Sequence, residues 1–127
     1  MAVDPSGRLI DHVHLRVVDL ERSRVFYRAV LAAIGLAGAI REGDGYFSAD
    51  ELWIDAADRP KGPVSRVHLA FKAVDQAAVQ AFHRAALGAG GRDNGGPGER
   101  HYHPGYYAAF ALDPDGNNVE AVFHGPR

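Results

Sequence analysis

Two histidines and one glutamate, His12, His68 and Glu120, are the residues whose types and spacing point most directly to chemistry. Imidazole nitrogens with one carboxylate oxygen suit Zn, Fe, Mn, Co or Ni, and three such ligands leave coordination positions open for water and substrate. The sequence therefore indicates a site for a divalent metal ion, whose identity stays open among these five, if the fold brings the three side chains together.

An internal repeat connects the two histidines. Residues 11–35 align with residues 67–91 at an offset of 56 positions (68 − 12), with nine of 25 positions identical. The matches include His12/His68, Val18/Val74, Asp19/Asp75, Phe26/Phe82, Arg28/Arg84, Leu31/Leu87 and Gly35/Gly91. A unit that opens twice on the same histidine predicts two symmetry-related strands that aim their imidazoles at a shared centre.

Each copy of the repeat is expected to run as strand, helix and then short strands. In copy one, a strand over 10–17 is followed by a helix that Asp19 caps, which runs to about Ile34 and stops at Gly35. Copy two repeats this with a strand from His68, a cap at Asp75 and a helix that ends within 88–91. Further strands are expected near 37–42, 46–49, 52–56, 106–112 and 118–123, with a linker at 59–63 and a flexible loop at 92–98.

Strand alternation places the three candidate ligands on one side of the sheet. Val13, Leu15 and Val17 alternate with His12 and its neighbours, so helices that cover the apolar side leave His12 facing away from them. The same alternation turns His68 and Glu120 to the helix-free side. We therefore expect all three in a solvent-accessible concave surface.

Each residue also has an ordinary structural interpretation. A single histidine on a half-buried strand is more often a hydrogen-bonding residue than a ligand, and Asp-Pro-Asp-Gly at 113–116 is by itself only a tight-turn sequence. His14 shares the face of His12 and is a competing ligand, but the repeat pairs His68 with His12. His83 and His124 are expected to be solvated.

A second group of residues is expected to line the site. His103 is a candidate acid or base near neutral pH, in a stretch rich in His and Tyr. The candidate substrate pocket consists of His14, Trp53, Tyr106 and Tyr107. The alternative for these aromatic residues is simple packing on the sheet.

Composition excludes several classes of protein. The 127 residues carry a formal net charge of −2 with no basic stripe, so nucleic acid and anionic membranes are not expected partners. There is no cysteine, which removes disulfides, thiolate ligands and a cysteine nucleophile. The first residues, MAVDPSGR, lack the apolar core expected of a signal peptide and no apolar run of 18 residues occurs, so a soluble cytoplasmic protein is the default expectation.

Three segments resemble one family: DHVHLRVVDLERSRVFYRAVL, RVHLAFKA and YYAAFALDPDGNNVEAV. They are similar to the vicinal oxygen chelate superfamily of glyoxalases, bleomycin-resistance proteins and extradiol dioxygenases. The resemblance implies an α+β fold with two tandem βαβββ modules in a single domain, 1–127. The modules, about 9–58 and 64–124, would form a curled mixed-sheet cup around a divalent metal, with the helices on its outer face. It also implies that His12, His68 and Glu120 are the ligands, as the residue patterns indicate.

The chain departs from some members of that superfamily. Glyoxalase I enzymes add a fourth ligand from the last strand of module one, where this chain offers Glu51 and Asp55, with Asp55 the preferred candidate. The potassium loop of fosfomycin-modifying relatives is absent. Bleomycin-binding members lack the ligands that are present here, and extradiol dioxygenases share them in longer chains.

The resemblance thus implies a metal-dependent enzyme that binds two neighbouring oxygens of a small-molecule substrate. A glyoxalase-like lyase or isomerase, with Glu120 and His103 as its catalytic residues, is the preferred interpretation. A short ring-cleaving dioxygenase and a non-catalytic small-molecule (antibiotic) binding protein are the alternatives. Because superfamily members often complete their cups between subunits, we expect a homodimer.

Overall fold

The fold is α+β, and a computed structural model describes it over residues 10–57 and 63–126. The first half of the chain forms β1 (Val13–Val17), α1 (Leu20–Ala33), the 3₁₀ turn η1 (Ala37–Ala39), β2 (Ile40–Gly43), β3 (Tyr46–Ala49) and β4 (Leu52–Ala56). The second half forms β5 (His68–Lys72), α2 (Gln76–Gly88), β6 (Arg92–Asp93), β7 (Gly98–Glu99), β8 (Tyr107–Leu112) and β9 (Asn118–Phe123). Most of the expected linker, 59–63, lies outside the described residues.

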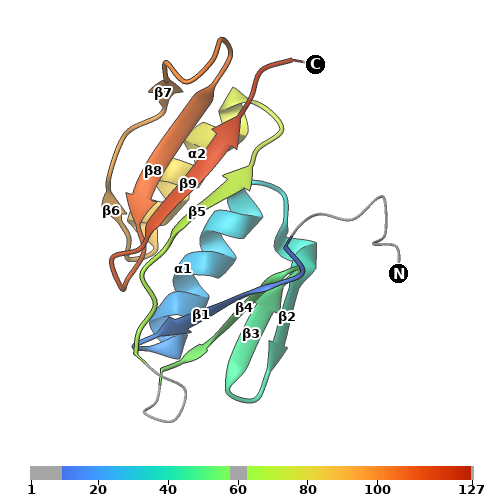
Figure 1. Ribbon diagram of the computed structural model, residues 1–127, viewed down its shortest axis with the longest axis vertical. Coiled ribbons are helices and arrows are strands. Elements are labelled where there is room, and N and C mark those ends of the chain that lie inside the picture. Colours follow the sequence, from blue (N-terminus) through green and yellow to red (C-terminus); the bar gives the residue numbers. More distant parts are fainter. Residues whose placement is uncertain (1–9, 58–62, 127) are drawn as a thin grey trace.

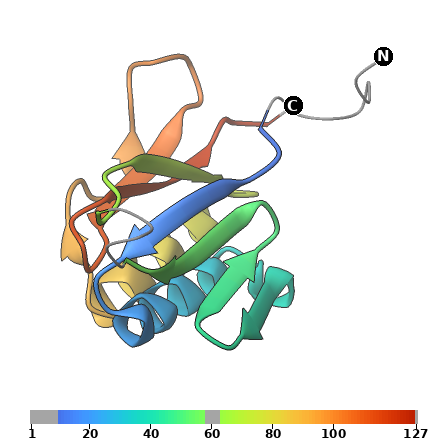
Figure 2. The same ribbon diagram turned by 60° about the horizontal axis from the view of Figure 1, so that its bottom comes forward.

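Each half of the chain builds its own sheet, and the strand order confirms the internal repeat. The first sheet runs β1-β4-β3-β2 and the second runs β5-β9-β8-β6, with β7 added on β8. In both, the first strand pairs in parallel with the last one, and the remaining main pairs are antiparallel. The two sheets lie side by side and are not closed into a barrel (Figures 1 and 2).

Both helices lie on the same side of the two sheets and pack against each other (Figure 2). As expected, the side chains of Asp19 and Asp75 cap them, accepting hydrogen bonds from Arg22 N at 3.2 Å and Ala78 N at 2.8 Å. The chain leaves α1 through Gly35, whose φ of +84° favours glycine. One apolar cluster joins the helices to both sheets, so the two halves share a core.

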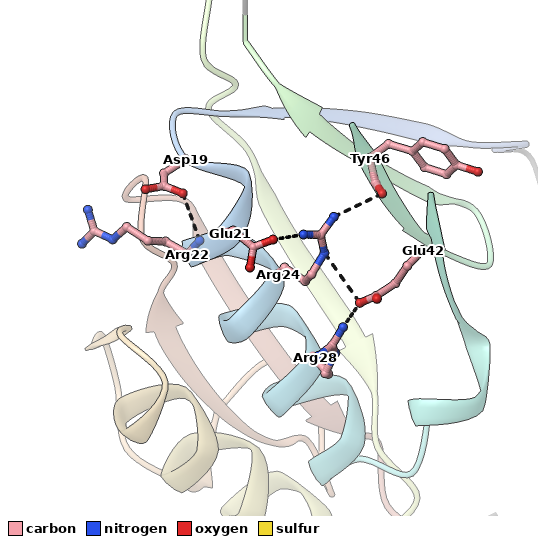
Figure 3. Close-up of polar contacts among 7 residues, drawn as sticks. All are labelled: Asp19, Glu21, Arg22, Arg24, Arg28, Glu42 and Tyr46. Carbon is pink, nitrogen blue, oxygen red and sulfur yellow. Dashed lines mark hydrogen bonds and ion pairs between the residues drawn. The ribbon is translucent and has the colours of Figure 1, made fainter. Parts of the chain in front are cut away.

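An ion-pair network ties α1 to the β2–β3 hairpin (Figure 3). The Arg24 guanidinium bonds Glu21 on its own helix and lies 3.6 Å from the Glu42 carboxylate on β2. Arg28, one turn further along α1, pairs with the same Glu42. The Arg24 side chain is only 17% exposed and sits over the Phe47 ring. The hairpin is therefore held to α1 at its polar edge as well as through the core.

The expected alternation holds on β1 with one difference in length. Leu15 and Val17 are fully buried, while His14 and Arg16 on the opposite face are half-buried. The strand begins at Val13 instead of residue 10, so His12 lies immediately before it. Elsewhere, the stretch 37–42 opens with a 3₁₀ turn, and the expected loop 92–98 holds β6 and the start of β7.

None of the described helices is long and apolar enough to cross a membrane.

Candidate functional site

His68 and Glu120 form a contact pair on the second sheet. His68 opens β5 opposite Asn118, and its ring Nε2 lies 2.8 Å from Oε1 of Glu120, two residues further along the parallel strand β9. The Glu120 side chain is 2% exposed, whereas that of His68 is 53% exposed. Glu120 is therefore buried beneath an accessible imidazole, in contrast to the solvent-accessible position expected from strand alternation.

The second carboxylate oxygen of Glu120 accepts a hydrogen bond from the Tyr106 hydroxyl. Burial, together with this hydrogen bond to Glu120, raises the pKa of Tyr106 to about 12. The phenol therefore stays protonated near neutral pH and remains a donor to Glu120. Tyr106, expected in a substrate pocket, thus contacts a candidate ligand directly.

His103 is linked to Glu120 through the ring of Tyr106. Its Nε2 is 2.9 Å from Nδ1 of His124, its Nδ1 bonds the Pro104 carbonyl at 2.8 Å, and its ring meets the edge of Tyr106. Because a carbonyl only accepts, the Nδ1 of His103 carries a proton. His124 is exposed, as expected, and it is also one member of a hydrogen-bonded histidine pair.

The first sheet carries a second histidine–carboxylate pair, but on His14. His14 lies opposite Trp53, and its Nε2 is 2.7 Å from Oδ1 of Asp55, two residues further along the parallel strand β4. This spacing matches that of His68 and Glu120. Asp55, the preferred fourth-ligand candidate, is 6% exposed and is held by His14.

His12 lies apart from that pair, at the rim of a hollow. Its ring bonds the adjacent Asp11 at 2.9 Å, and its side chain is 70% exposed. Glu51 lies nearby, since its carbonyl accepts the backbone N–H of Val13 at 2.7 Å. The hollow, about 500 Å³ in volume, is lined by His12, His14, Ser48, Asp50, Glu51 and Trp53.

Trp53 occupies the position in the first sheet that corresponds to Glu120 in the second. The pairing of Val13 with Leu52 continues back to place Glu51 opposite His12, and Trp53 follows two residues later. The indole stacks on the Tyr46 ring at 4.0 Å with an interplanar angle of 9°. The stacked rings of Trp53 and Tyr46, called the aromatic wall below, therefore occupy the position that the buried carboxylate of Glu120 occupies in the second sheet.

The described residues bring two of the three candidate ligands together and leave the third apart. Within 10–57 and 63–126, no three ligating side chains gather closely enough to hold a metal ion. Tyr107, the last expected pocket residue, instead accepts a hydrogen bond from Gln80 of α2. One chain thus presents the His68–Glu120 pair, called the half-site below, in its second half. Its first half presents His12 beside the aromatic wall.

A buried network under the 113–116 turn supports the half-site. The Tyr27 hydroxyl of α1 donates to the Asp113 carboxylate at 2.5 Å, and Asp113 also accepts two hydrogen bonds from Asn117. The amide oxygen of Asn117 in turn accepts the N–H of Val67, the residue before His68. The turn sequence predicts the turn but not this network. His83, which the repeat aligns with Tyr27 and which was expected to be solvated, has a side chain only 14% exposed and bonds the Asp93 carboxylate at 2.9 Å.

Comparison with known proteins gives the family. The model of the Glyoxalase/Bleomycin resistance protein/Dioxygenase superfamily matches residues 9–121. The chain belongs to this superfamily. The resemblance seen in the sequence segments is thereby confirmed.

Solved structures of the superfamily share the fold over nearly the whole chain. A glyoxalase/bleomycin resistance protein from Albidiferax ferrireducens is 28% identical with a TM-score of 0.79, covering 91% of this chain and 99% of its own. A glyoxalase-related enzyme from Fulvimarina pelagi is 19% identical (TM-score 0.70; 92% and 88% covered). Lactoylglutathione lyase from Agrobacterium tumefaciens is 24% identical (TM-score 0.60; 94% and 96% covered). No curated protein matches.

Proposed function

We propose that this protein is a divalent-metal-dependent enzyme whose ligands are His12, His68 and Glu120. The observation that carries the proposal is the 2%-exposed Glu120 carboxylate in contact with His68. A buried carboxylate is costly unless a positive charge or strong donors compensate for it, and a His–carboxylate pair is a donor set that divalent metals accept. Both residues also fall where the superfamily resemblance expects ligands.

The third ligand, in this proposal, comes from a second copy of the chain. His12 is absent from the cluster formed by His68 and Glu120, and it sits at an open rim next to exposed apolar residues. Ile10 is 56% exposed and Trp53 is 39% exposed. A two-fold homodimer would cover these side chains and bring His12 of the partner subunit to the half-site.

The chemistry proposed is that of a glyoxalase-like lyase or isomerase. A bound divalent metal supplies Lewis acidity toward two neighbouring oxygens of a small substrate. His68 and Glu120 would hold the metal ion, and the Tyr46–Trp53 stack forms an apolar wall beside His12. Glu51 is better placed than Asp55 to add a fourth ligand, which would be the second carboxylate, since it lies opposite His12 whereas Asp55 is held by His14.

A second candidate function, ring cleavage by a dioxygenase, is favoured by Trp53. With an indole in the position equivalent to Glu120, the protein ligands number two histidines and one carboxylate. With Fe(II) bound, such a set would leave coordination positions open for substrate and for O₂. His103, joined to Glu120 through Tyr106, is then the candidate acid or base near the site.

Metal analysis of variants tests the proposal. Protein made without a His tag should hold Zn, Ni, Co, Mn or Fe, and His12→Ala, His68→Ala and Glu120→Ala should each lose most of it. His14→Ala is the matched control and should retain metal. Loss of metal in His14→Ala with retention in His12→Ala would show that the ligands were assigned to the wrong histidine.

Oxygen uptake then separates the two chemistries. The glyoxalase-like candidate predicts turnover of a hemithioacetal or α-hydroxycarbonyl compound by the Ni, Co or Zn form with no oxygen consumed. Oxygen uptake with a catechol that requires Fe(II) and disappears in Glu120→Ala would establish the dioxygenase instead.

A further inference from the structure

We propose that Tyr106 is a positioning residue for Glu120: its hydroxyl group holds one carboxylate oxygen so that the other faces the metal position beside His68. The inference rests on the proposed metal-binding function and extends it to a residue that is not itself a ligand.

The contacts of Glu120 divide cleanly between its two oxygens. Oε1 faces His68 Nε2 at 2.8 Å, and Oε2 receives the Tyr106 hydroxyl. A carboxylate held at one oxygen by a fixed donor loses its freedom to rotate about its last side-chain bond. The oxygen that faces His68 is therefore already oriented before a metal ion arrives.

The backbone of Tyr106 is fixed by the loop between β7 and β8, at the upper end of Figure 1. Its N–H donates to the His103 carbonyl at 3.1 Å, and its carbonyl accepts from Arg100 N at 2.9 Å. The preceding Gly105 has φ of +89°, and a Cβ there would lie 3.0 Å from the carbonyl oxygen of His124. The loop thus closes tightly against the segment that follows β9.

The phenol ring is held as firmly as its backbone. The rings of His103 and His124 meet it nearly edge-on, each with a centroid distance of 5.3 Å, and Tyr102 meets it at 5.0 Å. These three contacts use the ring, while the hydroxyl donates to Glu120. Removing the hydroxyl should therefore spare the packing and remove only the donor.

The structure offers a matched control in the next residue. Tyr107 is also a tyrosine of this segment, but its hydroxyl accepts a hydrogen bond from Gln80 of α2 at 2.9 Å. Tyr106→Phe and Tyr107→Phe thus each delete one hydroxyl with one hydrogen bond, and only the first touches Glu120.

The experiment is a titration of the full-length protein with Co(II), followed by calorimetry and by the visible absorption of the bound ion. Groups that orient a metal ligand typically contribute about 10- to 100-fold in affinity. Tyr106→Phe should weaken Co(II) binding by about this factor and shift the absorption bands, while Tyr107→Phe should match the wild type.

Two outcomes would contradict the inference, and only the second of them would also contradict the proposed function. If the wild type binds Co(II), Glu120→Ala abolishes binding and Tyr106→Phe binds like Tyr107→Phe, Tyr106 does not position the ligand although the metal site stands. If the wild type binds no Co(II), the proposed function fails and the inference fails with it.

A measurement on the unmodified protein guards against a Tyr106→Phe variant that does not fold. The hydroxyl proton of Tyr106 should appear far downfield in the proton spectrum, assigned by its cross-peaks to the Tyr106 ring. It should persist when Zn(II) is added to saturation, since the hydrogen bond to Oε2 is kept in the metal-bound form. Disappearance of this signal on Zn(II) binding would show that Tyr106 releases Glu120, contrary to the inference.

Discussion

The Glu120 carboxylate combines burial with a polar contact at each of its two oxygens. Glu120 is 2% exposed and has His68 on one oxygen and Tyr106 on the other. Asp113, also 2% exposed, is satisfied by Tyr27 and by groups of its own turn. Buried carboxylates of this kind are costly when one partner is lost. Their partners are therefore the positions where single substitutions should have the clearest effects.

Tyr27→Phe should lower the free energy of unfolding by about 1.5–3 kcal/mol at neutral pH, because a buried charge loses a hydrogen-bond donor. Burial, followed by the charge of Asp113, raises the pKa of Tyr27 well above its ordinary value. The unfolded chain therefore releases this proton at a lower pH than the folded protein, and the stabilisation by Tyr27 falls as pH rises above about 10.

Urea unfolding of wild type and Tyr27→Phe between roughly pH 7 and pH 11 tests both the loss of stability at neutral pH and its dependence on pH. The difference in stability should be largest at neutral pH and should narrow above about pH 10. A difference that stays constant or widens with pH would contradict the assigned cause.

Among the elements, the helices are set by their caps. Asp75→Ala should destabilise the protein by about 1 kcal/mol, because the N–H of Ala78 loses the side-chain oxygen that accepts it at 2.8 Å. Asp75→Asn keeps an acceptor and should stay close to the wild type. Thermal and urea unfolding of the two variants provide the measurement, and equal losses in both would argue that the charge, and not the cap, is responsible.

Local patterns were enough to predict most elements. The strands at 46–49, 52–56 and 118–123, both N-caps and the stop at Gly35 agree with the sequence expectations. These depend on alternation, cap chemistry and positive φ, which act over a few residues. The 3₁₀ turn at 37–39 and the short strands β6 and β7 were missed because such brief elements have no periodicity.

Contacts between distant residues could not be predicted in the same way. The repeat identified His68, and strand alternation put Glu120 on the same side of the sheet, so the contact pair on the second sheet was anticipated as a shared face. Tyr27 and Asp113 lie 86 residues apart, and their hydrogen bond depends on how α1 packs against the second half of the chain. The Tyr106–Glu120 bond likewise needs the loop closure at Gly105.

At the scale of the whole molecule, the two halves of one chain carry unequal parts of a candidate site. The second half holds the His68–Glu120 pair, and the first half holds His12, apart from it. The repeat makes the two halves similar in structure, but Trp53 in the first half occupies the position that Glu120 occupies in the second. A homodimer would combine one half from each chain into a complete ligand set.

Sedimentation should therefore give a species of about twice the 13.7 kDa chain mass at tens of micromolar protein. The dimer should persist in His12→Ala, because the proposed interface includes apolar groups such as Ile10 and Trp53 besides the ligand. A single species at the mass of one chain over the whole concentration range would contradict the proposed assembly.

The central claim, a metal site shared between two chains, is tested most directly by a heterodimer of His12→Ala and Glu120→Ala chains, isolated with two different tags that do not bind metal. Neither homodimer has a complete site. In the heterodimer, His12 of the Glu120→Ala chain meets the intact His68 and Glu120 of the other chain, so about one metal ion per heterodimer is predicted. A heterodimer as empty of metal as both homodimers, alongside a wild type that binds metal fully, would show that the ligands do not come from two chains.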